Sequence, residues 1–99
     1  MNELQGPQRR YLAREAHSLK PLVYVGKAGV TDEVVRALDE ALGHHELVKV
    51  KFNGHKDEKQ PLSRELAGRT SSALVSVIGN IAVIYRRNED PDLRRYVLP

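Results

Sequence analysis

The chain has no cysteine and no tryptophan among its 99 residues, and phenylalanine occurs once. Without cysteine, disulfides, thiolate metal sites and cysteine nucleophiles are excluded, and the composition fits a reducing compartment, so we expect a cytoplasmic protein. Four tyrosines are the remaining members of the Phe/Trp/Tyr class. The core must therefore be built mainly from valine, leucine, isoleucine and alanine.

Long apolar runs are also lacking. No stretch of the sequence approaches the roughly 20 apolar residues that a membrane-spanning helix needs. The N-terminal segment 1–10 ends in Arg9 and Arg10 with no apolar run after them, so we expect no signal peptide. A chain of this length predicts one domain over residues 1–99 with no membrane partner.

An excess of charge of one sign is present but small. The chain has 16 Lys and Arg against 13 Asp and Glu, which gives a net charge of +3. A basic balance favours anionic partners, of which nucleic acid is the commonest, although a merely soluble basic surface gives the same total. The positions of the basic residues, more than their number, must decide between these interpretations.

Hydrophobic patterning predicts three helices and four strands. The helices are expected over residues 8–17 and 32–43 and from about Pro61 to Gly68, and the strands over 21–25, 46–52, 73–78 and 81–86. Gly79-Asn80 between the last two strands indicates a hairpin. The order α-β-α-β-α-β-β predicts an α/β (mixed α+β) fold, a four-stranded mixed sheet with helices packed on it.

Several local expectations follow from this order. Thr31 is a good N-cap for the second helix, and Gly43 is expected to end it. Tyr24 and Tyr85 lie in apolar runs and are expected in the core. The tail 88–99 is expected either to be loose or to add residues 96–98 to a sheet edge. In residues 46–52 an alternating pattern predicts a buried face and an outer face. The outer face holds Leu47, Lys49 and Lys51.

The loop Gly26-Lys27-Ala28-Gly29 joins a predicted strand to the predicted second helix. Two glycines let a backbone turn tightly and approach a ligand closely, the helix start offers free N–H groups, and Lys27 adds a cation. Such a loop suits a phosphodiester and is the device of KH-type RNA-binding proteins. A plain strand-to-helix turn is the alternative. A Walker A loop and a dinucleotide fingerprint are excluded by spacing.

Catalytic, metal and cofactor sites are not expected. The serines lie in no nucleophile-elbow context, and the carboxylates fit solvated faces. His44, His45 and Glu46 are adjacent, and adjacent residues cannot easily present ligands to one ion, so we expect them to cap a helix or maintain the fold. We therefore predict no enzyme, no metal, no cofactor and no small-molecule substrate.

Segments 17–31 and 44–51 resemble the CRM (chloroplast RNA splicing and ribosome maturation) domain, and 79–86 is similar to that family's final hairpin. The resemblance covers about residues 7–87, departs most over 55–72, and in length is similar to the free-standing bacterial YhbY-type members. It implies a fold akin to the C-terminal domain of translation initiation factor three. It also implies RNA binding and, for bacterial members, association with precursors of the large ribosomal subunit.

The resemblance assigns backbone contact to the loop residues Gly26, Lys27, Ala28 and Gly29. It extends the basic surface to Lys20, Lys49, Lys51 and Arg86, and Arg10 and Arg14 are outer candidates from their shared helix face. For Lys49 and Lys51, and for Arg10 and Arg14, a solvated surface is the alternative. We expect an RNA-binding ribosome-assembly factor whose partners are ribosomal RNA and the pre-ribosomal large subunit. The alternatives are an adaptor that docks on a ribosomal protein and an intron-splicing cofactor.

Overall fold

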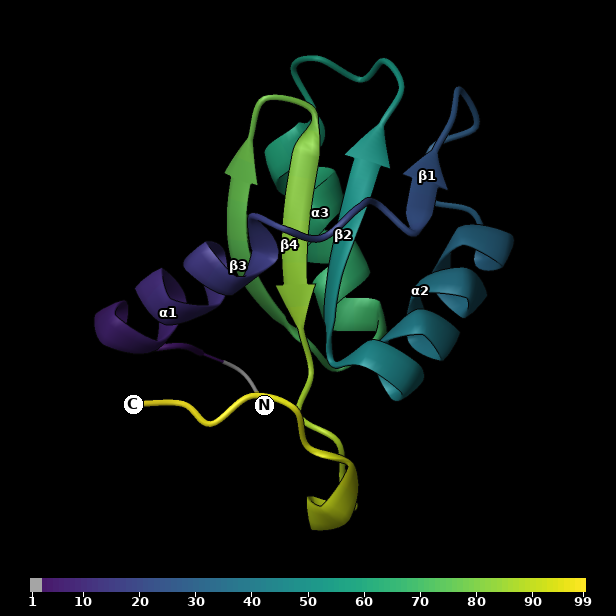
Figure 1. Ribbon diagram of the computed structural model, residues 1–99. Coiled ribbons are helices and arrows are strands. Elements are labelled where there is room, and N and C mark those ends of the chain that lie inside the picture. The colour runs from purple at the N-terminus through teal and green to yellow at the C-terminus, as the bar shows by residue number, and fades with distance from the viewer. Residues whose placement is uncertain (1–2) are drawn as a thin grey trace.

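The computed structural model describes residues 3–99 and has the element order expected from the sequence. Residues 1 and 2, part of the segment predicted not to be a signal peptide, lie outside the described residues. Figure 1 shows the arrangement. The elements are α1 (Gly6–Ala16), β1 (Val23–Val25), α2 (Asp32–His45), β2 (Leu47–Phe52), α3 (Lys59–Arg69), β3 (Ala73–Ile78), β4 (Ile81–Tyr85) and a short 3-10 helix, η1 (Pro91–Leu93).

The four strands form one mixed sheet in the order β1-β2-β4-β3. β1 is parallel to β2, and the other two pairs are antiparallel, so the predicted mixed sheet is confirmed. The β3–β4 hairpin turns at Gly79, whose φ of +57° lies in the left-handed region that favours glycine. Because β1 and β2 are parallel, the loops that follow them leave the same end of the sheet.

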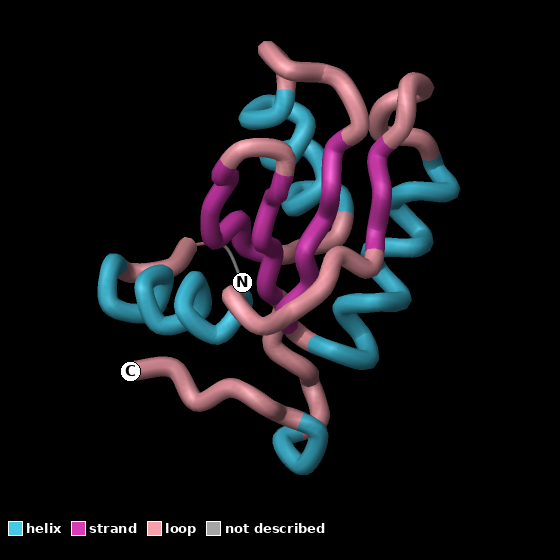
Figure 2. The backbone as a smooth tube through the Cα atoms, turned by 45° about the horizontal axis from the view of Figure 1, so that its top comes forward, coloured by secondary structure: helices cyan, strands magenta, loops and turns pink. Residues whose placement is uncertain are grey.

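Helices α2 and α3 pack on one face of the sheet, as Figures 1 and 2 show from two directions. Thr31 caps α2 as predicted, since its hydroxyl accepts a hydrogen bond of 3.2 Å from the Val34 amide. The apolar stripe of α2 then faces the strands. The buried residues of this core are Val23, Val25, Leu38, Leu42, Val48, Val50, Phe52, Leu66, Ala82 and Ile84.

The other face is covered only in part, by α1 and the C-terminal tail. The prediction that Leu47 lies on the opposite face from Val48, Val50 and Phe52 is confirmed, but Leu47 is buried, because α1 and the tail cover that end of β2. Lys51, at the far end, stays exposed. The buried residues of this second core are Leu4, Leu12, Ala16, Leu47, Ala73, Val75, Val83 and Tyr85.

Two local predictions are corrected at the lower end of the molecule. Helix α2 does not stop at Gly43 but continues to His45, and Glu46 ends it with a φ of 62°. The tail is neither loose nor an added strand, because it packs on the second core with Tyr96 edge-on to Tyr85 at 6.4 Å between ring centroids. None of the helices within residues 3–99 has the length and apolar character that a membrane crossing needs.

Replacing Tyr85 with phenylalanine is expected to stabilise the protein by about 1 kcal/mol, because the buried Tyr85 hydroxyl makes no hydrogen bond to the described residues. Burial, reinforced by the Glu46 carboxylate, raises the pKa of Tyr85 above its ordinary 10.0. The unfolded chain therefore loses this proton first, and wild-type stability falls as pH rises through and beyond 10. The phenylalanine variant lacks that part of the alkaline loss. Urea unfolding at about pH 7 and about pH 11 measures both effects, and a variant less stable than wild type at both would contradict them.

Candidate nucleic-acid interface

The loop after β1 is a closed turn that faces solvent. The Gly29 amide donates to the Gly26 carbonyl at 3.0 Å, which closes the four-residue turn, and the next bond runs from the Thr31 amide to Gly29 at 3.1 Å. Gly29 has a φ of +76°, so its glycine is required by the backbone. Gly26 has no such conformation, and a Cβ there would meet nothing within 4 Å. The space in front of Gly26 is therefore open to a ligand.

Lys27 at the tip of this turn is exposed and forms no ion pair with a described residue. The two acids at the start of α2 are the natural competitors for its charge. Asp32 instead pairs with Arg69 at 2.8 Å, and Glu33 lies 4.0 Å from Arg36. The positive charge of Lys27 is consequently left to attract an anion from solvent.

His55, from the loop between β2 and α3, holds the turn in place. Its Nε2 lies 2.8 Å from the Gly26 carbonyl, which accepts the hydrogen bond when that nitrogen carries the proton. Its Nδ1 lies 3.7 Å from a carboxylate oxygen of Glu58. The imidazole also packs under Gly29, where a Cβ would come within 3.8 Å of its Cε1. His55 thus supports the turn from the side away from solvent.

Replacing His55 with alanine is expected to loosen the turn without unfolding the domain. One hydrogen bond to the Gly26 carbonyl is lost, so amide exchange in residues 26–29 should quicken roughly 5- to 10-fold while global unfolding changes little. Hydrogen exchange read by mass spectrometry or NMR measures this. The exposed His44, replaced in the same way, is the control. Equal exchange rates in the two variants would remove His55 from this role.

Three loops meet at this end of the sheet, at the top of Figure 1: the loops after β1 and after β2, and the turn between β3 and β4. The Asn53 amide donates to Val25 at 2.8 Å, and the Phe52 amide donates to Asn80 at 2.8 Å, which joins the three chain segments. Lys56 and Lys59 also lie at this end of the sheet, and neither was predicted from the sequence. Lys56 is exposed, and Lys59 donates to the Asn80 side chain at 2.5 Å. The parallel pairing of β1 with β2 places the loops that follow these strands side by side, so it would have predicted Lys56 and Lys59 near Gly26-Lys27-Ala28-Gly29.

The predicted lysines of β2 continue the positive surface along the sheet face that α1 leaves open. Lys51 is exposed beside the loop and helps to line a shallow pocket of about 250 Å³ that includes Gly26. Lys49 is half-buried one repeat further along the strand. Its carbonyl accepts from Leu22 at 3.1 Å, which places the exposed Lys20 two residues away from this pairing. Together with Lys27 on the loop, these three lysines follow one path down the sheet.

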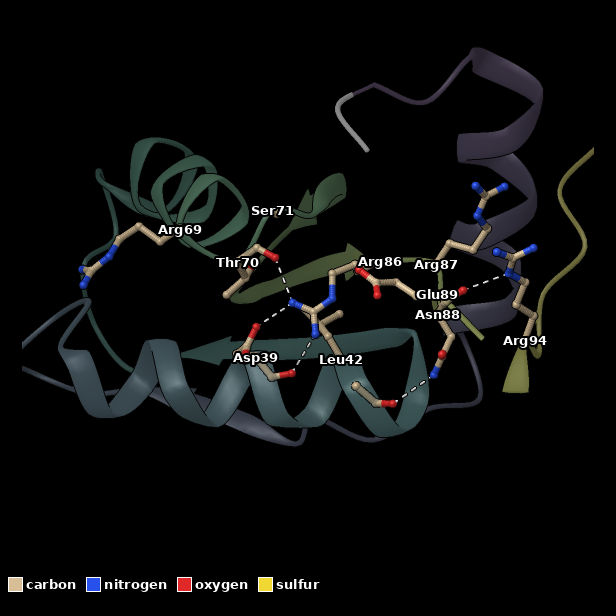
Figure 3. A pocket seen from close by; sticks show the side chains of 11 residues that line it. Asp39, Leu42, Arg69, Thr70, Ser71, Arg86, Arg87, Asn88, Glu89 and Arg94 are labelled. Atoms are coloured by element: carbon tan, nitrogen blue, oxygen red, sulfur yellow. Dashed lines mark hydrogen bonds and ion pairs between the residues drawn. The ribbon is translucent and has the colours of Figure 1, made fainter. Parts of the chain in front are cut away.

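Arg86 is not part of this path. It lies at the opposite end of the sheet, in an open hollow of about 790 Å³ shown in Figure 3. Its guanidinium donates to the Asp39 carboxylate at 2.6 Å and to the carbonyls of Asp39 and Thr70, each at 2.9 Å. These bonds tie the end of β4 to α2 and α3. The prediction that Arg86 extends the basic surface beside the loop is therefore corrected, because Arg86 lies at the other end of the sheet and its guanidinium donates to protein acceptors.

Arg10 and Arg14 are exposed on α1. This helix packs on β2, β3 and β4, at the half of the sheet that includes Leu47 at the start of β2, whereas the loop follows the edge strand β1. Figure 1 shows the separation. Neighbouring Arg9 takes a structural part, since it donates to the carbonyls of Leu74 and Val75 at 2.8 and 3.0 Å. The structure thus leaves this arginine pair as a separate basic patch.

The His44-His45-Glu46 run serves the end of α2. The two histidines lie exposed in its last turn, as expected for residues near the carbonyl end. Glu46 is 1% exposed, and its two carboxylate oxygens accept from the backbone amides of Asn88 and Arg95 at 2.6 and 2.5 Å. Between residues 3 and 99 no three His, Asp or Glu side chains gather as a metal site.

Comparison with known proteins gives consistent matches. A family model described as the CRS1 / YhbY (CRM) domain matches residues 4–86. A Haemophilus influenzae protein named "RNA-binding protein" is 37% identical over 95 residues, which is 95% of this chain and 96% of that one. "Probable RNA-binding protein YqeI" of Bacillus subtilis is 36% identical over 88 residues, 88% of this chain and 92% of that protein.

A solved structure matches the fold as well. The solution structure of a hypothetical protein from Staphylococcus aureus, described as a candidate RNA-binding protein, superposes with a TM-score of 0.81 at 36% identity. The match covers 98% of this chain and 100% of the other. The two chains therefore share one fold over nearly all of this chain.

Proposed function

Since this chain belongs to the CRS1/YhbY (CRM) domain family, we propose that it binds RNA and acts in assembly of the large ribosomal subunit. The observation that carries the proposal is Lys27, which is exposed, pairs with no acid within residues 3–99, and lies on a turn that is open at Gly26 and supported behind by His55. The names of the relatives, which give RNA binding for those proteins, point the same way. The proposal contains no catalytic step.

In the proposed contact the RNA backbone lies across the turn and down the open sheet face. Gly26 lets the backbone approach, Lys27 pairs with a phosphate, and Lys51 and Lys49 face the following phosphates. Lys56 stands beside the turn, and Lys20 lies at the end of the path. Phosphates carry no base identity, so these contacts fix position and orientation and give little sequence preference.

Binding is expected to weaken steeply with salt. If the lysine path neutralises about three to five phosphates, the slope of log K against log salt is roughly −2 to −3.5, a loss of roughly 20- to 130-fold from 50 to 200 mM salt. Titration of a labelled single-stranded RNA by fluorescence anisotropy measures the slope. A protein-docking adaptor predicts a flat dependence and no retention on a polyanion resin, and that result would contradict RNA binding.

The ribosomal part of the proposal needs a test in cells. Crosslinking followed by sequencing of the attached RNA should recover large-subunit ribosomal RNA, and the protein should sediment with large-subunit precursors in a gradient. Nuclease treatment before sedimentation distinguishes attachment through RNA from attachment through a ribosomal protein. Release by nuclease supports RNA contact, whereas retention on a ribosomal protein after complete RNA digestion favours the adaptor.

A further inference from the structure

The half of the sheet face next to the loop is uncovered. The register places Tyr24 of β1 beside Lys51 of β2, Lys51 opposite Ile81 of β4, and Ile81 opposite Ile78 of β3. These four side chains therefore form one row across the sheet. Tyr24 is 61% exposed and Ile78 is 74% exposed. The expectation that Tyr24 belongs to the core is wrong, because α1 and the tail cover only the other half of this face.

The Tyr24 end of this row adjoins the loop. Tyr24, Val25, Gly26, Lys51 and Asn53 line the shallow pocket of about 250 Å³. This pocket is smaller than the roughly 300–1,000 Å³ of sites that enclose a whole small molecule. It is bounded by an aromatic ring, a cation and a side-chain amide that both donates and accepts hydrogen bonds. None of its five lining residues is acidic.

These groups match the parts of a single nucleotide. An exposed aromatic ring stacks on the face of a base, an Asn side chain can bond its edge, and a lysine pairs with the phosphate. The charge is complementary as well, because Lys51 forms no ion pair among residues 3–99 and Lys27 lies on the adjoining turn. An apolar partner would instead leave both lysines without compensation for lost hydration.

We propose that this pocket binds one unpaired nucleotide of the RNA, with its base stacked on Tyr24, its edge at Asn53 and its phosphate between Lys51 and Lys27. The nucleotide site rests on the proposed function, since it lies within the same RNA-binding surface. A base inside a duplex is stacked on both sides and cannot present its face to Tyr24. The ligand class is therefore RNA with a single-stranded or bulged nucleotide beside the gripped backbone.

A tryptophan at position 24 reports the stacking directly. The chain contains no tryptophan, so Tyr24→Trp has one indole, and its exposed site tolerates the larger ring. An oligo(A) single strand of about 12 nucleotides should quench its fluorescence, whereas an RNA duplex of about 12 base pairs should not, because only the single strand offers unpaired bases. Equal quenching by both probes, or by neither, would overturn the site.

Removal of the ring supplies the second test. Tyr24→Ala should weaken oligo(A) binding roughly 5- to 100-fold, the range expected for loss of one stacked base, while Tyr24→Phe keeps most of the affinity. Affinity for the duplex should not change. Leu93→Ala is the matched control, because Leu93 is also apolar and exposed, at 59%, but lies in η1. Circular dichroism melting confirms that each variant is folded.

The outcomes separate this site from the proposed function. Unchanged oligo(A) affinity in Tyr24→Ala, together with a clear loss in Lys27→Glu, overturns the nucleotide site and leaves backbone binding in place. No RNA binding by the wild-type protein overturns both. Stacking is supported if Tyr24→Ala loses affinity for oligo(A) but not for the duplex and Tyr24→Phe keeps that affinity. A merely structural role for Tyr24 would weaken the binding of both probes equally.

Discussion

Lys27→Glu is expected to weaken RNA binding on the order of 10- to 100-fold while the domain stays folded. Lys27 is exposed and has no ion pair with a described residue, so its replacement removes nothing from the fold. A hydrogen bond to a charged group contributes roughly 1.5–3 kcal/mol, and the introduced carboxylate adds repulsion against the phosphate. Fluorescence anisotropy at moderate salt measures the loss.

Two variants make this result specific. Arg87→Glu changes the net charge by the same amount at the other end of the sheet, and β2 between them spans roughly 20 Å. It should have a much smaller effect if position matters more than net charge. Lys27→Gln removes the cation without adding an anion, so it should lower the salt slope by about 1 and weaken binding less than Lys27→Glu does. Equal losses in Lys27→Glu and Arg87→Glu would exclude the loop as the point of contact.

The order of elements could be predicted because each carries a local signal. Thr31 precedes two acids and an apolar stripe, and Gly79-Asn80 separates two β-branched runs, so the start of α2 and the final hairpin depend on neighbours in sequence. Burial on the outer sheet face has no such signal. Leu47 and Tyr24 both belong to that face, and only the path of α1 and the tail decides that one is buried and the other exposed.

The candidate loop could be recognised from its glycine spacing, but the roles of its glycines could not. Gly29 is required by its positive φ, whereas Gly26 is open and unstrained. His55 was missed because it lies 29 residues after Gly26, and only the parallel pairing of β1 with β2 brings the two loops together. Arg86 was overassigned for the converse reason, since its partner Asp39 lies 47 residues away.

Glu46→Ala is expected to lower the free energy of unfolding by about 2–4 kcal/mol, more than any other charged-to-neutral change considered above. The Glu46 side chain is buried, and its two oxygens accept from the amides of Asn88 and Arg95 at 2.6 and 2.5 Å. Loss of both acceptors leaves two partly buried N–H groups without partners. For a domain of this size the melting temperature should fall roughly 10–25 °C.

Detachment of the tail should accompany the loss of stability. The tail contributes Tyr96 and Leu98 to the second core, and the Glu46 carboxylate fixes the two ends of the segment between Asn88 and Arg95. Hydrogen exchange at these two amides should therefore quicken more than exchange in β2. The exposed Glu40 on α2, replaced with alanine, is the matched control and should change neither quantity by much.

Glycine at position 46 separates the loss of the acceptors from backbone strain. Glu46 adopts a φ of 62°, which a residue with a Cβ rarely takes, so alanine keeps this strain and glycine relieves it. Glu46→Gly should then be about 1 kcal/mol more stable than Glu46→Ala, though still well below wild type. If instead the glycine variant matched wild type, loss of the two acceptors would cost no more than the strain that glycine relieves, about 1 kcal/mol, which is below the expected loss of about 2–4 kcal/mol. The carboxylate would then hold the tail much more weakly than its burial and its two short hydrogen bonds indicate.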